Sequence, residues 1–163
     1  MGPDAVSQIV QQTADSLWPI ARRDRQITVV AAVPEDLPPV WGDHQRVVQI
    51  LGNLVRNAFR HTPEGGLIAL RAERQDGWVT VSVEDTGEGI PPERIPHLFD
   101  RFYRGDEARD RASGGAGLGL AIVRELVEAM GGDVSVASTV GQGSCFSFRL
   151  PVAREATPDP AEA

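Results

Sequence analysis

Hydrophobic residues recur every three or four positions in three segments of the chain, and this spacing predicts three amphipathic helices. The apolar face of the first helix, within residues 6–21, consists of Val6, Ile9, Val10, Leu17, Ile20 and Ala21. The second helix, residues 44–61, follows Asp43, a residue type that commonly caps a helix N-terminus. The third, residues 118–130, is followed by Gly131-Gly132, a frequent helix stop.

Between the helices, stretches that alternate apolar with polar residues or are rich in β-branched side chains predict about five strands. These strands cover residues 26–33, 67–74, 78–84, 134–136 and 145–150. Asp76-Gly77 between two of them is typical of a hairpin, and a second tight turn is predicted at residues 141–143. Helices and hairpins in alternating blocks favour an α/β two-layer sandwich of mostly antiparallel strands over a doubly wound sheet.

The other segments of the chain lack such periodicity. Pro91-Pro92-Glu93 is expected to start a short helix that runs to about Phe99. Residues 103–115 are charged and glycine-bounded, which predicts a mobile loop. We expect an N-terminal helix in residues 1–24, one main domain in residues 25–151, and a disordered tail rich in Ala, Pro and Glu in residues 152–163.

The composition of the chain excludes several classes of function. The chain has 163 residues, 41% of them hydrophobic and 24% charged, which is typical of a globular domain, and no apolar run approaches the roughly 18 residues of a membrane span. A net charge of −7 argues against nucleic acid as a partner. All 16 basic residues are Arg, which excludes a P-loop and Schiff-base chemistry, because both need Lys. Cys145 is the only cysteine, so neither an internal disulfide nor a cysteine-based metal site can form.

Two asparagines interrupt the apolar pattern of the second helix. Asn53 and Asn57 are one turn apart, so both amides lie on one helix face. A buried amide must find partners, and an amide oxygen can coordinate Mg²⁺. The alternative for either Asn is an ordinary core amide with protein partners. Arg60 and His61, one turn further, can donate to phosphate.

An acidic residue and two glycines follow the strand at 78–84. Asp85 ends this strand, and Gly87 and Gly89 come directly after it. The carboxylate can accept a hydrogen bond from an exocyclic amine such as that of adenine, while the glycines allow backbone to approach a planar ring. The alternative is an ordinary turn, since Asp-Thr-Gly is common turn material.

A glycine-rich segment, residues 114–119, leads into the third helix. Backbone N–H groups at such a helix start can hold phosphate oxygens. A Rossmann fold is disfavoured because no strand immediately precedes these glycines. The alternative is a flexible linker. Just before them, an otherwise acidic protein has a local basic cluster, formed by Arg101, Arg104, Arg109 and Arg111.

Taken together, these segments, residues 98–104 and the Gly141–Ser144 turn resemble the N, G1, F, G2 and G3 boxes of the catalytic ATP-binding domain of bacterial sensor histidine kinases, a Bergerat-fold ATPase. The similarity covers about residues 41–151 and implies ATP and Mg²⁺ as cofactors. It implies Asn57 as the metal ligand, Asn53, Arg60 and His61 near the phosphates, and Asp85 on the adenine amine. The residues implied to line the remaining pocket or its lid are Gly87, Gly89, Ile90, Arg104, Gly115, Gly117, Leu118, Gly119 and Ser144. Asn57, Arg60 and Arg104, the last of these on the γ-phosphate, are the implied catalytic residues.

Two positions depart from the family pattern. Arg60 stands where the family often has Lys, which keeps the charge and changes its geometry. Ala116 occupies a position that is frequently Thr in the family, so a hydroxyl contact is lost while the backbone N–H stays, and this change favours weaker nucleotide affinity.

None of the three histidines, His44, His61 and His97, stands in the helical phosphoacceptor motif of the family. The resemblance therefore implies that the γ-phosphoryl goes to a histidine on a dimerisation domain outside this chain, with a response regulator downstream. We expect the isolated domain to be monomeric and its parent to be a homodimer, with this domain on the cytoplasmic side of a membrane-anchored sensor kinase.

The alternatives to a histidine kinase are a hydrolytic ATPase, a serine kinase and a binding module without catalysis. Gyrase-, chaperone- and mismatch-repair-type ATPases resemble one another in a general-base Glu where this chain has Asn53, so we expect slow ATP hydrolysis here. An anti-sigma-factor-type serine kinase of the same fold is the main alternative, although the segment around Arg104 and the long lid fit sensor kinases better. A binding module without catalysis is disfavoured by the intact Asn57, Asp85 and glycines.

Overall fold

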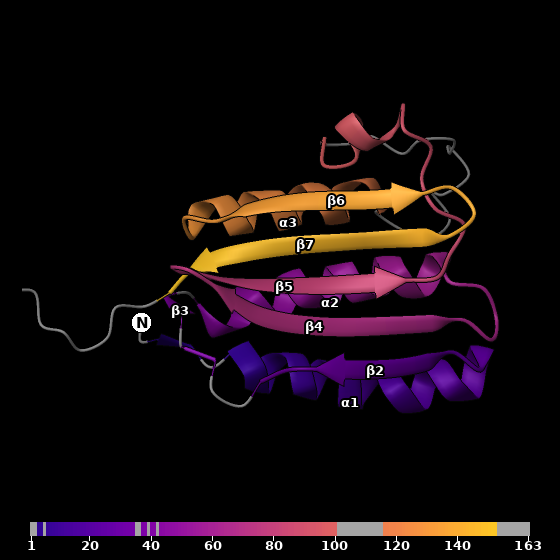
Figure 1. Cartoon of the computed structure of the whole chain (residues 1–163), viewed down its shortest axis with the longest axis horizontal. Coiled ribbons are helices and arrows are strands. Elements are labelled where there is room, and N and C mark those ends of the chain that lie inside the picture. The colour runs from indigo at the N-terminus through magenta and orange to yellow at the C-terminus, as the bar shows by residue number, and fades with distance from the viewer. Residues whose placement is uncertain are drawn as a thin grey trace, which may run out of the picture.

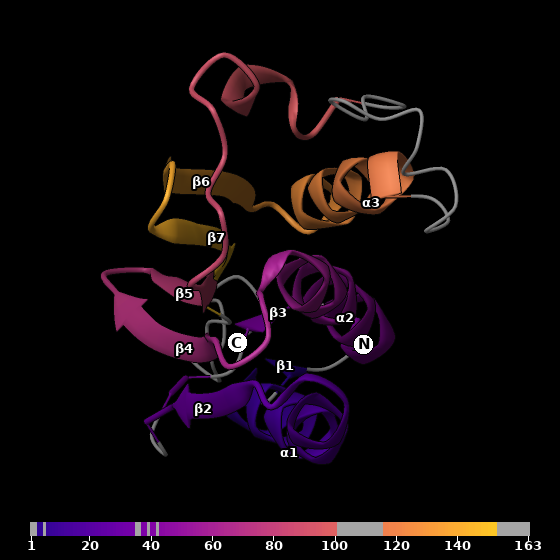
Figure 2. The same ribbon diagram turned by 90° about the vertical axis from the view of Figure 1, so that its right-hand side faces the viewer.

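The computed structural model describes residues 3–4, 6–34, 37–38, 40–41, 43–100 and 116–152. In this part of the chain, three helices cover one face of a five-stranded sheet, and Figure 2 shows the two layers end-on. The helices are α1 (Val6–Arg25), α2 (His44–His61) and α3 (Ala116–Ala129). The two-layer sandwich predicted from the sequence is confirmed.

The sheet has the strand order β2-β4-β5-β7-β6 (Figure 1). Its strands are β2 (Thr28–Ala32), β4 (Leu67–Gln75), β5 (Trp78–Asp85), β6 (Asp133–Thr139) and β7 (Gly143–Pro151). Strand β2 runs parallel to β4, and the other neighbours are antiparallel. A separate small ribbon pairs β1 (Pro3–Asp4) with β3 (Val40–Trp41).

Alternation along β5 explains how the strand positions a carboxylate. Val79, Val81 and Val83 face the helices and are each 1% exposed, whereas the residues between them are only half-buried. The same period of two carries Asp85 onto the helix side, where it is 3% exposed. On the opposite face, the hydroxyls of Ser82 and Ser147 lie 2.9 Å apart. The strand therefore delivers one charged group to the end of an otherwise apolar face.

Both ends of α2 are capped by side chains. The Asp43 carboxylate accepts a hydrogen bond from the backbone N–H of Gln45 at 3.0 Å, as its position ahead of the helix predicts. At the other end, Thr62 donates to the carbonyl of Ala58 at 2.6 Å, and Arg25 donates to the carbonyl of Phe59 at the same distance. Because these contacts satisfy carbonyls that the helix leaves free, α2 ends in a fixed place next to the sheet.

Some predicted elements differ from the structure. The short helix expected up to Phe99 is only a 3-10 turn, Ile95–His97, whose interior proline cannot donate a backbone hydrogen bond. Ile20, assigned to the apolar face of α1, is 45% exposed. Helix α3 begins at Ala116, two residues before the predicted start. The predicted mobile loop at 103–115, and all but the first residue of the predicted tail, lie outside the described residues.

Among the residues that the structure describes, no helix combines the length and apolar character that a bilayer crossing requires.

Candidate functional site

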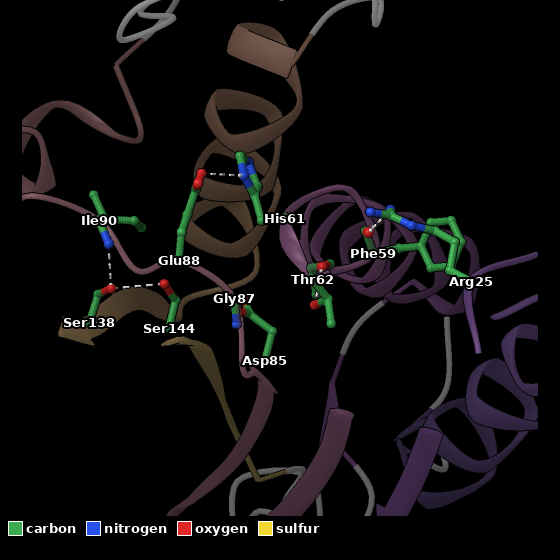
Figure 3. Close-up of polar contacts among 11 residues, drawn as sticks. Arg25, Phe59, His61, Thr62, Asp85, Gly87, Glu88, Ile90, Ser138 and Ser144 are labelled. Atoms are coloured by element: carbon green, nitrogen blue, oxygen red, sulfur yellow. Dashed lines mark hydrogen bonds and ion pairs between the residues drawn. The ribbon is translucent and has the colours of Figure 1, made fainter. Parts of the chain in front are cut away.

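Asp85 is the centre of the candidate site (Figure 3). One carboxylate oxygen, Oδ1, accepts a hydrogen bond from the backbone N–H of Gly87 at 2.8 Å. The other, Oδ2, is buried and has no hydrogen-bond partner in the described part of the chain. Burial raises the pKa of Asp85, although the backbone N–H of Gly87, the charge of His61 and the backbone N–H of Ser144 each lower it in part. A buried acceptor without a partner is costly, so the site is built for a ligand that donates a hydrogen bond there.

The loop that follows Asp85 is held between α2 and the β6–β7 hairpin. A Cβ on Gly87 would overlap the carbonyl of His61, and a Cβ on Gly89 would overlap the carbonyl of Thr139. Gly89 also has φ +81°, a conformation that L side chains rarely adopt. The carbonyl of Glu88 accepts a hydrogen bond from the N–H of Gly141 at 2.7 Å. Glycine is therefore required at both positions by close backbone packing.

Helix α2 and the first turn of α3 form a second wall of the candidate site. The Asn53 amide donates to the carbonyl of Gly119 at 3.4 Å, and its oxygen accepts from Arg56. Asn53 thus has protein partners, as the core-amide alternative expected, and it also joins two segments that the sequence assigned to one site. Asn57, one turn further along α2, is half-buried.

The first turn of α3 carries several of the predicted glycines. Gly117, Leu118 and Gly119 lie within this turn, whose backbone N–H groups have no partners inside the helix. A Cβ on Gly119 would meet no described atom within 4 Å, so packing among the described residues does not require glycine there. A ligand at this helix N-terminus is expected to be an anion, because the backbone N–H groups and the helix dipole favour negative charge there.

Basic side chains collect at the C-terminal end of α2. A cavity of about 450 Å³ is lined by Arg25, Arg60 and His61 together with Thr86, Gly87, Glu88 and neighbouring residues. His61 Nδ1 lies 3.7 Å from a carboxylate oxygen of Glu88, a contact that connects α2 with the loop after Asp85 (Figure 3). Arg60 and His61 thus line the same cavity as Gly87.

The far side of the loop is held by serine hydroxyls. Ser144, 8% exposed, pairs with Asp85 across β5 and β7. Ser138 on β6 contacts both the Ser144 hydroxyl, at 2.8 Å, and the backbone N–H of Ile90, also at 2.8 Å. Asp85, Gly87, Ile90 and Ser144 therefore lie together.

Not every predicted site residue has a described position, and some contacts were missed. Arg104 and Gly115 lie outside the described residues. Sequence reasoning did not identify Ser138, Arg25 or Arg56 as neighbours of the site. Strand alternation could have placed Ser138 on the helix-facing side, but a serine in a strand has no feature that marks it as a contact of a distant loop.

A sandwich with a buried carboxylate ending a central strand, close-packed glycines after it and a helix N-terminus opposite defines a nucleotide-binding domain. The chain belongs to the histidine kinase-, DNA gyrase B- and HSP90-like ATPase family, which it matches over residues 42–154. Within this family it is an ATP-binding catalytic domain of the sensor histidine kinase type.

Relatives support this placement. The adaptive-response sensory kinase SasA of Thermosynechococcus vestitus is 43% identical over 146 residues, which make up 89% of this chain and 38% of that kinase. Full-length ShkA, solved in complex with AMPPNP, is similar with a TM-score of 0.82 and 38% identity over 97% of this chain and 32% of the ShkA chain. The mycobacterial sensor histidine kinase MprB matches with a TM-score of 0.75 and 28% identity, over 93% of this chain and 98% of that one. The chain thus spans about a third of the length of SasA and of ShkA.

Proposed function

We propose that this domain transfers the γ-phosphoryl group of ATP to a histidine on a dimerisation domain, with a response regulator as the downstream partner. The observation that carries the proposal is the buried Oδ2 of Asp85, which has no partner among the described residues, while Oδ1 is bonded to Gly87 in the segment that resembles the family's G1 box. Relatives named as sensor kinases support the same activity. The cytoplasmic location and a homodimeric parent stay predictions.

Each wall of the site has a role in this proposal. Asp85 Oδ2 accepts a hydrogen bond from the adenine amine, and Gly87 and Gly89 let the purine approach the backbone. The phosphates extend toward the first turn of α3, where free N–H groups and the helix dipole stabilise negative charge. Arg60 and His61 add donors from the end of α2.

Mg²⁺ fits the residues present. The described part of the chain has no group of three or more His, Cys, Asp or Glu side chains that could hold a metal ion by themselves. Mg²⁺ does not need such a group, because it commonly takes one or two protein oxygens and completes its shell with phosphates and water. We assign the protein oxygen to the amide of Asn57. When bound, the ion neutralises charge on the transferring phosphoryl group.

The same site favours transfer over hydrolysis. In its described surroundings, the Asn53 side chain bonds to Gly119 and Arg56, and an amide cannot take a proton from water. A histidine acceptor needs no such base, because its imidazole nitrogen attacks with a lone pair. A P–N bond forms as the P–O bond to the β-phosphate breaks, and ADP leaves. Positioning and charge stabilisation then supply the catalysis.

The direct test incubates the purified chain with γ-labelled ATP, Mg²⁺ and a histidine-bearing dimerisation fragment from its parent kinase. Acid-labile label on the fragment is the expected result. Asn57→Ala should abolish the transfer, while Val48→Ala, a substitution on the exposed side of the same helix, should leave it unchanged. Acid-stable phosphoserine on a protein partner, without phosphohistidine, would instead support the anti-sigma-factor-type serine kinase.

A further inference from the structure

The hydroxyl of Ser138 lies at a junction of three segments. It accepts a hydrogen bond from the backbone N–H of Ile90 at 2.8 Å and donates to the carbonyl of Gly143 at 2.9 Å. The hydroxyl of Ser144, its register partner on β7, lies 2.8 Å away. Ser138 thus connects β6 with the loop after Asp85 and with the start of β7 (Figure 3).

Either hydroxyl could donate in the Ser138–Ser144 hydrogen bond, and counting protons favours Ser144 as the donor. A serine hydroxyl has one proton and two lone pairs, and a carbonyl can only accept. With its proton on the carbonyl of Gly143, Ser138 uses both lone pairs as acceptors, one for Ile90 N–H and one for the Ser144 hydroxyl. All the groups are satisfied in this arrangement. The proton of Ser144 is then committed to Ser138, so toward any ligand the Ser144 oxygen can only accept.

Ser144 stands directly across from Asp85 in the sheet. The unpartnered Oδ2 of Asp85 is also an acceptor, so this end of the site offers two acceptors and no side-chain donor from these two residues. A purine with a 6-amino group donates two hydrogens there. A purine with a 6-oxo group presents an acceptor to acceptors, which is unfavourable.

We infer that Ser138 is a positioning residue that acts through Ser144 to favour 6-amino over 6-oxo purine nucleotides. The inference rests on the proposed contact between Asp85 and the purine amine. Without the Ser138 hydroxyl, Ser144 is free to rotate and to donate to a 6-oxo group, so the discrimination between the two purines decreases.

The test compares the affinities of ADP and IDP, which differ at the 6-position of the base, by calorimetry with Mg²⁺ present. Ser138→Ala should reduce the ADP-to-IDP affinity ratio about five- to tenfold, the effect of one or so net hydrogen bonds. Ser82→Ala is the matched control: it removes another hydroxyl–hydroxyl contact in the same sheet, on the face away from the site, and should leave the ratio unchanged.

A double-mutant cycle separates this role from simple support of the loop. In a Ser144→Ala background, Ser138→Ala should change the ratio less than twofold, because the residue through which it acts is gone. An equal loss of ADP and IDP affinity in Ser138→Ala, an unchanged ratio, or full additivity in the cycle would overturn the inference. If Ser138→Ala does not fold, Ser138→Cys, whose thiol is a weaker donor and acceptor, takes its place under the same criteria.

The affinities of the wild-type protein for ADP and IDP distinguish the role of Ser138 from the proposed contact between Asp85 and the purine amine. A wild-type preference for ADP that Ser138→Ala leaves unchanged refutes the role of Ser138 alone. Equal wild-type affinity for ADP and IDP refutes the amine contact of Asp85 and the inference together.

Discussion

Replacing Asp85 with Asn should make the nucleotide-free domain more stable and impair its binding of nucleotide. The Asn oxygen can still accept the Gly87 N–H hydrogen bond that Oδ1 accepts at 2.8 Å. The substitution removes a charge from a position that is 3% exposed and replaces the unpartnered Oδ2 with an amide nitrogen. The Asp85 carboxylate thus lowers the stability of the nucleotide-free domain but is needed to bind nucleotide.

The size of the effect follows from burial. A buried polar group without a partner costs about 1–3 kcal/mol, and more when it is charged. The Asn amide nitrogen is itself unpaired, so we expect a net gain of about 1–2 kcal/mol in the free energy of unfolding at pH 7. For a chain of this length, 1 kcal/mol corresponds to about 2–4 °C in melting temperature, so Asp85→Asn should melt about 2–8 °C higher.

The difference in stability between Asp85→Asn and wild type should increase with pH. The pKa of Asp85 is raised in the folded protein above its ordinary value of 3.8, chiefly by burial. Below that value both states hold the proton and the carboxyl contributes no pH-dependent penalty. As pH rises, the unfolded state ionises first, so wild type loses stability until the pH exceeds the folded pKa. The difference between variant and wild type should therefore grow from about pH 4 upward and then level off.

Thermal unfolding followed by circular dichroism between pH 4 and 8 measures this difference. Asp133→Asn is the matched control, because Asp133 is exposed and paired with Arg149 at 2.9 Å; its melting temperature should not rise. In calorimetry, Asp85→Asn should weaken ADP binding about 10- to 150-fold, the loss of one hydrogen bond to a charged group. A melting temperature for Asp85→Asn at or below that of wild type at pH 7 would show that the buried carboxylate does not destabilise the nucleotide-free domain.

Three further outcomes are expected. Asp43→Ala removes the N-cap of α2 and should cost about 0.5–2 kcal/mol in chemical denaturation, with ADP affinity retained; an unchanged midpoint would contradict the capping role. Gly87→Ala forces a Cβ onto the carbonyl of His61 and should lower both stability and ADP affinity, whereas Gly77→Ala, where a Cβ meets nothing within 4 Å, should retain the affinity; equal affinity losses in the two variants would contradict a role in binding for the close packing at Gly87. Because Asn53 cannot act as a base, phosphate release by the isolated chain should stay below about 1 s⁻¹, and faster steady turnover would contradict the kinase assignment.

The sequence predicted the features that depend on local pattern. The period of 3.6 placed α2, and Asp43 caps it as expected. Alternation along β5 placed Asp85 at the end of a buried face, next to glycines that the backbone packing requires. These features are predictable because each rests on residues close together in the chain.

Features that depend on distant segments were not predictable in this way. The parallel pairing of β2 with β4 joins strands that α2 separates in the chain, and the residue pattern of either strand alone does not encode it. Asn53 bonds to Gly119, 66 residues later in the chain, and Ser138 bonds to Ile90, 48 residues earlier. Such contacts arise only after the layers have assembled, so neither spacing nor residue type reveals them beforehand.

A crystal structure of the chain with ADP and Mg²⁺ would show whether Asp85 and Asn57 hold the nucleotide and its metal. We predict the adenine amine within hydrogen-bonding distance of Asp85 Oδ2, the metal on the amide oxygen of Asn57, and the phosphates directed toward the first turn of α3. A nucleotide bound elsewhere, or a purine in this site that leaves Asp85 Oδ2 without a partner, would contradict this prediction.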